Sequence, residues 1–399
     1  MIILVNRSIV NQFDSSKLST KHEKSCFFIG VGHYGLVYIV QVFYCQNERI
    51  ILMKVNIMKY LFLVISVLAS WGCQGTSSET KMLVEGDPLT GQFVMKEGED
   101  IILQYNYQTV HEEDVVVLES AKAENYTRRQ RDTFVTTSIY AVPRSDYIHP
   151  VYGLQGEMLT RDWPDGAHPH HRGIFWAWPE VYYGSRLGDI YALQEVFARP
   201  TGEIDLVNGP DFAQISAENQ WMWEDDEAIV REKAIIRVYS ATDHERIIDL
   251  ALRFTALVDS VTIATRETNS YGGLNLRMQT PDNQKITYHT DEPSSPMRRA
   301  WSDFFGTFDG ASSESGMTVL QHPDNPQYPG NWVEYPDLAW VQPTFPTPGT
   351  RFALKKGQPL ELRYRLILHR GGAQESHIYE SWWDQYKNDQ NVMGLLKDR

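Results

Sequence analysis

The chain has 399 residues and a formal net charge of −14, with 51 acidic and 37 basic side chains. An acidic protein of this kind repels nucleic acid and anionic lipid, so we expect no nucleic-acid partner. Aromatic residues make up 12% of the chain, a share that is typical of a folded protein and not of a disordered one.

A secretory signal of the lipoprotein type is predicted near the N-terminus. Met58-Lys59 forms a short basic start, the run from Tyr60 to Ala69 is apolar, and Gly72 precedes Cys73. A basic start, an apolar core of about ten residues and a small residue before the cleavage point define such signals. The alternative is that the apolar run is an ordinary buried strand.

This signal sets the expected organisation of the chain. We expect an upstream extension over 1–57, a signal peptide over 58–72, lipidation at Cys73, a polar tether over 73–84 and one domain over 85–399. The protein would then lie in the bacterial cell envelope, at the periplasmic face or on the outer surface of the outer membrane. Its only contact with a membrane would be the lipid anchor at Cys73.

Residues 85–399 contain short runs of β-type sequence, separated by turns rich in Gly, Pro, Asn and Asp. The runs are 93–95, 101–105, 115–118, 134–142, 234–239, 247–254, 261–264 and 360–368. The sequence therefore predicts an all-β fold, a large antiparallel β-sandwich of the supersandwich-like type.

One helix is expected, at the C-terminal end. Between Ala373 and Lys387, the residues Ile378, Trp382 and Tyr386 recur at helical spacing. The stretches 281–300 and 323–348 read as long loops and are candidates to form a site.

The densest chemistry of the chain lies in the histidine block, His168-Pro169-His170-His171-Arg172-Gly173. Histidine titrates close to neutral pH, and arginine presents a planar fork of donors that suits carboxylates. Trp176 and Trp178 follow shortly after, and indole faces can stack on sugar rings. The block is either a functional site or a polar turn that leads into a buried strand.

Further motifs accompany this block. They are Arg144-Ser145-Asp146-Tyr147-Ile148-His149-Pro150, Tyr271-Gly272-Gly273-Leu274-Asn275-Leu276-Arg277, His322-Pro323-Asp324-Asn325-Pro326, Asn331-Trp332 and Leu368-His369-Arg370-Gly371. Together they resemble a bacterial family that carries the label methane oxygenase PmoA-like and is treated as a domain of unknown function. The resemblance covers roughly residues 85–390 and implies an exported all-β sandwich found among carbohydrate-degradation genes. A membrane monooxygenase is not expected, because it needs several apolar spans of about 20 residues and none follows Cys73.

Acid and base catalysis on a glycoside requires a proton donor and a proton acceptor that face each other across the sugar. We predict that the catalytic groups are His170, His171, Arg172, His149 and Glu180. Asp189 or Glu157 are the alternatives to Glu180. The predicted substrate-binding residues are Arg144, Tyr147, His168, Trp176, Trp178, Arg277, His322, Asn325 and Trp332.

Metal binding is an alternative use of the histidines. The candidate ligands are His168, His170 and His171, joined by His149 or by a carboxylate from Asp162, Asp165 or Glu180. Such a set would suit a divalent metal such as zinc or iron. The sequence contains no recognised metalloenzyme spacing, so the cofactor stays open.

The sequence therefore predicts a carbohydrate-active enzyme of the cell envelope. It would be a glycoside hydrolase or lyase that acts on a carbohydrate substrate through histidine and arginine chemistry. Two alternatives remain, a non-catalytic glycan-binding lipoprotein and a metal-dependent oxidoreductase. Paired titratable groups with shifted pKa values would favour an enzyme.

Changing Cys73→Ser tests the predicted processing, because the thiol is the atom that would carry the lipid. We expect the variant to leave the membrane fraction, as measured by fractionation and by the mass of the protein. A variant that stays in the membrane fraction and retains residues 1–72 would contradict the signal.

Overall fold

The computed structural model describes residues 81–87, 89–111, 142–163, 168–266, 271–290, 295 and 297–397, together with three strands nearer the N-terminus. The chain divides into two compact units, Met1–Ser78 and Glu79–Arg399. In the first unit the three strands form an antiparallel sheet, β1 (Ser25–Val31), β2 (Val37–Phe43) and β3 (Met53–Asn56). The predicted signal over 58–72 and Cys73 lie outside the described residues.

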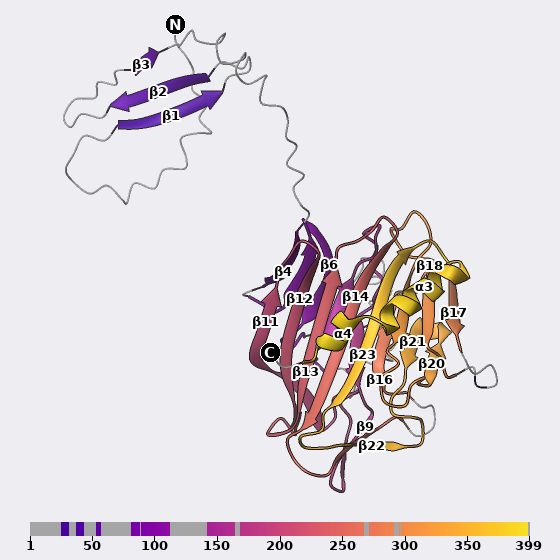
Figure 1. Ribbon diagram of the computed structural model, residues 1–399. Helices are drawn as coiled ribbons and strands as arrows, with labels where there is room; N and C mark the ends of the chain where they lie inside the picture. The colour runs from indigo at the N-terminus through magenta and orange to yellow at the C-terminus, as the bar shows by residue number, and fades with distance from the viewer. Residues whose placement is uncertain are drawn as a thin grey trace, which may run out of the picture. The chain divides into compact units, whose positions relative to one another are not determined.

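Two eight-stranded antiparallel sheets make up most of the second unit (Figure 1). We call the first the helix-covered sheet, with the strand order β11-β12-β13-β14-β23-β19-β18-β17. Its strands are β11 (Val196–Val207), β12 (Phe212–Trp223), β13 (Glu227–Tyr239), β14 (Glu245–Ala256), β17 (Asp282–His289), β18 (Trp301–Thr307), β19 (Ser315–Gln321) and β23 (Leu360–Arg370).

We call the second the loop-covered sheet, with the strand order β20-β21-β16-β8-β7-β6-β5-β4. Its strands are β4 (Met82–Gly86), β5 (Phe93–Glu97), β6 (Asp100–Asn106), β7 (Tyr147–Val151), β8 (Ile174–Ala177), β16 (Gly273–Arg277), β20 (Trp332–Tyr335) and β21 (Trp340–Pro343). Strand β4 begins inside the segment 73–84 that the sequence suggested as a tether.

The remaining elements are short. A four-stranded sheet has the order β10-β9-β15-β22, and its strands are β9 (Glu180–Tyr183), β10 (Arg186–Gly188), β15 (Val261–Ala264) and β22 (Arg351–Leu354). The helices are a 3-10 turn at Pro336–Leu338, α3 (Ser376–Lys387) and α4 (Gln390–Gly394). Within the described residues, no helix is both long and apolar enough to cross a bilayer.

The structure confirms the predicted antiparallel all-β fold with a C-terminal helix. Trp382 and Tyr386 form part of the buried side of α3, as their spacing predicted. The predicted runs 115–118 and 134–141 lie outside the described residues. The prediction of long loops was wrong in part, because 281–300 contains β17 and 323–348 contains β20 and β21. These strands are short or polar, and β17 is an edge strand with an exposed side, so their sequences lack a clear apolar alternation.

The space between the two large sheets holds the apolar core and two buried carboxyl groups. Glu232 on β13 accepts hydrogen bonds from the indole N–H of Trp221 at 2.6 Å and from that of Trp176 on β8. Asp146 accepts from the Tyr105 hydroxyl at 2.7 Å and from the Asn219 amide at 2.9 Å. Burial, followed by the charge of Asp146, raises the pKa of Glu232 well above its usual value. Polar bonds between strands of opposite sheets therefore fix how the sheets face each other.

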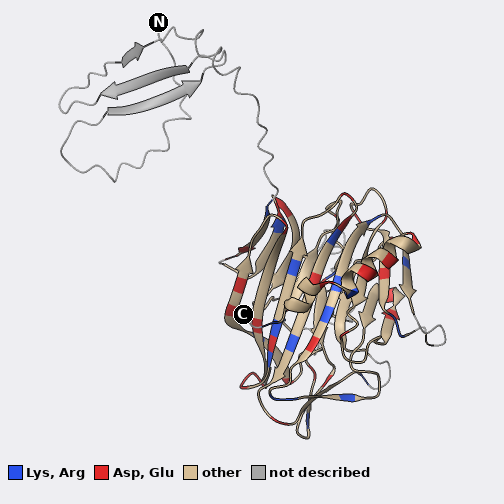
Figure 2. Ribbon diagram, viewed as in Figure 1, with Lys and Arg blue, Asp and Glu red and all other residues tan. Residues whose placement is uncertain are grey.

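The outer face of the helix-covered sheet packs against α3 and α4 (Figure 1). Tyr379 of α3 stacks on Trp301 with ring centroids 4.4 Å apart. Figure 2 shows charges of both signs along the strands beneath these helices. Arg365 on β23 pairs with Asp249 on β14 at 2.7 Å and with Asp389 at 2.8 Å. The charged side of β23 is therefore neutralised under the C-terminal segment instead of facing water.

The last residue of the histidine block, Gly173, sits where two strands approach closely. A Cβ atom there would lie 2.3 Å from the Ile148 carbonyl oxygen and 2.7 Å from the Cβ of His149. Its φ of +54° is also in the region that favours glycine. Glycine therefore allows the chain to enter β8 directly beside β7.

We expect Gly173→Ala to lower the free energy of unfolding by about 3–5 kcal/mol, because backbone strain and overpacking add. Gly184→Ala is the matched control. Its φ is +63° and nothing lies within 4 Å of its Cβ position, so only the strain of about 1–2 kcal/mol applies. Urea unfolding measures both, and equal losses would contradict the close approach at Gly173.

Candidate functional site

The outer face of the loop-covered sheet carries polar side chains that are buried instead of exposed. Along β8, Trp176 points to the core between the sheets, so its neighbour Phe175 points outward. Asn275 on β16 is the cross-strand partner of Phe175, and Arg277 is the partner of Trp340 on β21. Phe175, Asn275, Arg277 and Trp340 are all buried. Because a sheet face that contacts solvent would not bury them, the covering loops and this face together form a candidate site.

The histidine block forms a turn at the edge of this face. The backbone N–H of His171 donates to the carbonyl of His168 at 3.0 Å. The ring of His171 lies 4.8 Å from that of His168, stacked, and 4.6 Å from that of His170, edge-on. His171 is buried, whereas His168 and His170 are partly exposed. The turn therefore presents three imidazoles that run from the solvent to the sheet.

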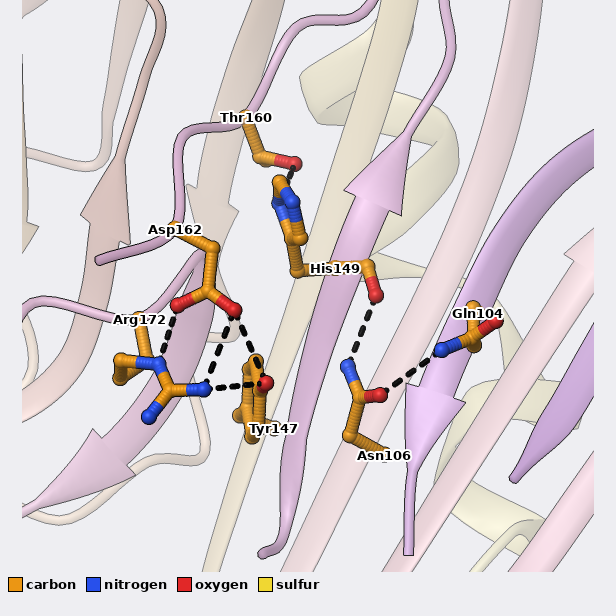
Figure 3. A network of polar contacts seen from close by, with 7 residues as sticks. All are labelled: Gln104, Asn106, Tyr147, His149, Thr160, Asp162 and Arg172. Atoms are coloured by element: carbon orange, nitrogen blue, oxygen red, sulfur yellow. Dashed lines mark hydrogen bonds and ion pairs between the residues drawn. The ribbon is translucent and has the colours of Figure 1, made fainter. Parts of the chain in front are cut away.

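A buried ion pair fixes the end of this turn (Figure 3). The Arg172 guanidinium binds both carboxylate oxygens of Asp162, with Nη2 to Oδ2 at 3.2 Å, and donates to the Tyr147 hydroxyl at 2.7 Å. The Tyr147 hydroxyl donates in turn to Asp162 at 2.9 Å. The guanidinium also lies 4.7 Å from the ring of Trp163. Arg172 is fully buried, so its visible role is to position the turn.

His149, two residues after Tyr147 on β7, bonds to Thr160 and Asn106 instead of to the ion pair (Figure 3). Its Nδ1 is 3.0 Å from the hydroxyl of Thr160, and its carbonyl accepts from the Asn106 amide at 2.7 Å. Only 1% of its surface is exposed. His149 therefore connects β7 with Thr160 and Asn106.

Aromatic rings connect the turn with the sheet. Trp340 lies 4.3 Å from the ring of His171, and Tyr191 lies 5.6 Å from that of His170. Phe175 contacts both Tyr191, at 5.3 Å, and Trp340, at 6.1 Å. Flat apolar rings beside titratable groups are a common arrangement in small-molecule sites.

Charged groups surround these rings. The guanidinium of Arg144 lies 4.6 Å above the Phe175 ring, and its Nη2 donates to the carbonyls of Ile190 and, at 2.9 Å, Tyr191. Asp189, in the same loop, accepts from Arg266 at 2.8 Å and from the Ala192 N–H at 2.8 Å. The loop 188–194 thus brings one carboxyl group and one tyrosine to the face where Arg144 lies.

Burial shifts the titration of these groups. Loss of hydration lowers the pKa of His170 to about 3, helped by the positive charges of His168, Arg144, Arg266 and Arg277. The pKa of His171 is lowered well below its usual value for the same reasons. Burial raises the pKa of Asp189 to about 6, although its hydrogen bonds and Arg266 oppose the shift. At neutral pH the site therefore contains neutral imidazoles and a carboxyl group that titrates close to the working range.

The candidate metal ligands His168, His170 and His171 all lie in this turn. A metal requires ring nitrogens that converge on one point, whereas His168 and His171 stack face to face. Among the described residues, no group of three His, Cys, Asp or Glu side chains is placed to hold a metal ion.

Several predicted site residues lie elsewhere. Trp178 packs against Trp221 and Phe254 in the core, and Trp176 binds Glu232 there. Glu180 on β9 accepts from the Tyr182 hydroxyl at 2.9 Å. Trp176, Trp178 and Glu180 therefore lie apart from the histidine turn. The predicted residues that the structure brings together are His168, His170, His171, Arg172, Tyr147, Arg144 and Arg277.

The motif around His322 forms a separate turn. The side-chain amide of Asn325 donates to the Arg363 carbonyl and accepts from the Arg363 N–H, each at 2.8 Å. His322 packs edge-on against Tyr386 of α3, and the Trp332 indole donates to the Arg299 carbonyl at 2.9 Å. All three predicted residues, His322, Asn325 and Trp332, are buried, and their described contacts hold loops to the sheets.

Four residues of the site were not predicted from the sequence: Tyr191, Arg266, Tyr271 and Trp340. Tyr271 lies 5.0 Å from Tyr191 and beside Arg266. Tyr271 precedes a Gly-Gly step and Asp189 lies two residues before Tyr191, which are weak signals for ligand loops. Trp340 gave no signal, because an isolated tryptophan in a strand is usually a core residue.

The lowered pKa of His170 makes the stability of the protein depend on pH. Its folded pKa of about 3 lies below the unfolded value of about 6.5, so the unfolded state takes up the proton first. Stability is therefore lost as the pH falls from about 6.5 toward 3. His170→Gln should lose about 2–3 kcal/mol less unfolding free energy than the parent between pH 7 and 4.5, by urea unfolding at both values. His377→Gln, at an exposed position, should lose as much unfolding free energy as the parent over this pH range. If His170→Gln also lost as much as the parent, the burial of His170 would be contradicted.

Comparisons with known proteins place the chain in one family. A search of curated proteins finds no match. The model of a family of unknown function, DUF6807, matches residues 127–383. This range covers the histidine turn, Arg144, the loop 188–194 and most of both large sheets. The chain belongs to the DUF6807 family.

Proposed function

We propose that the protein is a carbohydrate-active enzyme, a glycoside hydrolase or lyase whose acid and base groups lie on the outer face of the loop-covered sheet. One observation carries the proposal. A partly exposed neutral imidazole, His170, and a carboxyl group with a raised pKa, Asp189, lie in one charged and aromatic cluster. Groups with opposed pKa shifts are a signature of acid–base catalysis.

Each of these two groups has a role that follows from its environment. His170 stays neutral at working pH and accepts a proton, because burial disfavours the imidazolium. Asp189 holds its proton up to about pH 6 and donates it to the leaving oxygen. Arg266 links the two, since it pairs with Asp189 and its charge also lowers the pKa of His170. This assignment replaces Glu180 by Asp189 as the catalytic carboxyl group.

The surrounding residues suit a sugar ligand. Tyr271 supplies a partly exposed flat ring, and the rings of Tyr191 and Trp340 in the same cluster are buried. Sugar rings stack on such surfaces while their hydroxyl groups bond to polar side chains at the edge. Arg172 holds the turn through Asp162, and His149 connects β7 with Thr160 and Asn106, so both act as positioning residues in this proposal.

We also propose the cellular setting that the sequence suggested. The protein would be a lipoprotein of the bacterial cell envelope, anchored at Cys73. The DUF6807 family and the PmoA-like family that the motifs resemble would be one group of exported β-sandwich proteins. The signal-like segment before Cys73 and the motifs quoted above support this.

The proposal predicts a bell-shaped dependence of kcat/KM on pH, with limbs near pH 3 from His170 and near pH 6 from Asp189. Asp189→Asn should lower the rate by about a hundredfold and remove the limb near pH 6, because the amide cannot donate a titratable proton. Turnover of a glycan panel, measured from pH 3 to 9, gives both quantities. Asp225→Asn, on an exposed turn, is the control that should keep the parental profile.

Other outcomes would point to the alternatives. Tight binding of a glycan without turnover would indicate a glycan-binding protein, and a redox reaction that depends on added metal would indicate an oxidoreductase. An unchanged pH profile in Asp189→Asn would show that the catalytic carboxyl group lies elsewhere.

A further inference from the structure

We propose that the substrate is a sugar acid, and that Arg144 is the residue that binds its carboxylate. This inference rests on the proposed function and narrows the substrate from carbohydrates in general to carbohydrates that carry a carboxylate. It is carried by a buried guanidinium without an acidic partner, in a site where other buried polar atoms also lack partners.

Arg144 is a buried cation that forms no direct ion pair among the described residues, although the charges of Asp146 and Asp189 act on it from a distance. Only 4% of its surface is exposed, and both of its hydrogen bonds go from Nη2 to neutral backbone carbonyls. Among the described residues no acidic side chain forms an ion pair with it. The buried arginines 172 and 365, by contrast, each bind an aspartate. A buried charge without a counterion is costly, so a protein keeps one where an anion binds.

The geometry of Arg144 leaves donors for a ligand. Since Nη2 makes both bonds to the loop 188–194, Nε and Nη1 remain. Their N–H groups point to different sides of the guanidinium, so each can donate one hydrogen bond to a ligand. The contact with the Phe175 ring fixes the plane of the guanidinium group.

A second observation comes from the neighbours of Phe175. His171 Nδ1, Trp340 Nε1 and Gln342 Oε1 are buried and have no hydrogen-bond partner. The same is true of Nη1 of Arg172, the residue after His171. Buried polar atoms are almost always satisfied in native proteins, so a cluster of exceptions indicates a bound polar molecule. Hydroxyl and carboxylate groups of a sugar acid would supply both acceptors and donors.

The charge of the site supports an anion. The whole chain has a net charge of −14, yet Arg144, Arg172, Arg266 and Arg277 gather around the histidine turn. Three carboxyl groups lie near them. Asp162 pairs with Arg172, Asp189 pairs with Arg266, and Asp146 acts on Arg144 without a direct ion pair. A positive site in an acidic protein attracts small anions selectively.

A carboxylate suits this site better than a phosphate. Asp189 lies in the loop whose carbonyls bind Arg144. Above its pKa of about 6 this group is charged and repels a phosphate dianion more strongly than a carboxylate monoanion. The single positive charge of Arg144 suits a carboxylate monoanion, and the aromatic rings around it suit the sugar. The carboxylate would also place a sugar carbon that carries an acidic proton near His170.

The test compares matched sugars. The full-length chain is titrated by calorimetry with glucuronate and galacturonate, with glucose and galactose, with glucose 6-phosphate and with acetate. We expect each sugar acid to bind at least about tenfold more tightly than its neutral partner, since one charge-assisted bond supplies that factor. Arg144→Gln should reduce this preference at least about tenfold, and Arg199→Gln, at the far strand β11, should keep it.

The outcomes separate this inference from the proposed function. Equal binding of acidic and neutral sugars by the parent would overturn the sugar-acid inference and leave the enzyme proposal standing. Tighter binding of glucose 6-phosphate, or of acetate alone, would also overturn it. Sugar-acid binding without turnover of any acidic glycan would instead contradict the proposed enzymatic activity and support the proposed ligand. If Arg144→Gln fails to fold, the selectivity of the parent decides the result. Arg144→Lys keeps the charge but places it on a single nitrogen, so it should retain only part of the preference.

Discussion

The site depends on the ion pair between Asp162 and Arg172. Both side chains are almost completely buried, and removing one partner would leave a buried charge at a cost of about 3–5 kcal/mol. Arg172 follows the three histidines directly, and Asp162 precedes their turn, so the pair closes the turn at its base. Through the Tyr147 hydroxyl it also binds the turn to β7. The positions of the imidazoles therefore follow from one buried contact, and Gly173 allows the chain to pass from that contact into β8.

Much of the fold could be predicted from the sequence because its long strands alternate regularly. The strands around 234–239, 247–254 and 360–368 lie in the structure where the pattern placed them. The stretch 281–300 looked like a loop because β17 is a polar edge strand, and an edge strand buries too little to require an apolar face. Alternation of apolar and polar residues indicates that one face of a strand is buried. It says little about a strand such as β17, whose two faces are both largely exposed.

The site could be predicted in part. The concentration of histidine and arginine after residue 167 indicated the turn, and the structure places Arg144 and Arg277 near it. Trp176 and Trp178 looked equally suitable as surfaces for a sugar. Residues two apart along an extended segment share a face, and the face of these two points into the core. The sequence could not reveal this, because loops cover the other face and both faces contain apolar residues. Tyr191 and Trp340 come from distant segments, so only the topology of the sheets brings them to the histidines.

The groups buried in the site lower the free energy of unfolding, and the packed core between the sheets offsets this loss. Neutral buried histidines, a cation without a counterion and several unbonded polar atoms all lower the stability of the folded protein. The apolar core between the two large sheets, and the carboxyl groups of Asp146 and Glu232 bonded across it, compensate for that loss. A site that is destabilised when empty gains most from a ligand that satisfies it, because binding to the folded state alone stabilises that state. If the ligand is the sugar acid proposed above, its binding would recover part of the free energy that the empty site costs.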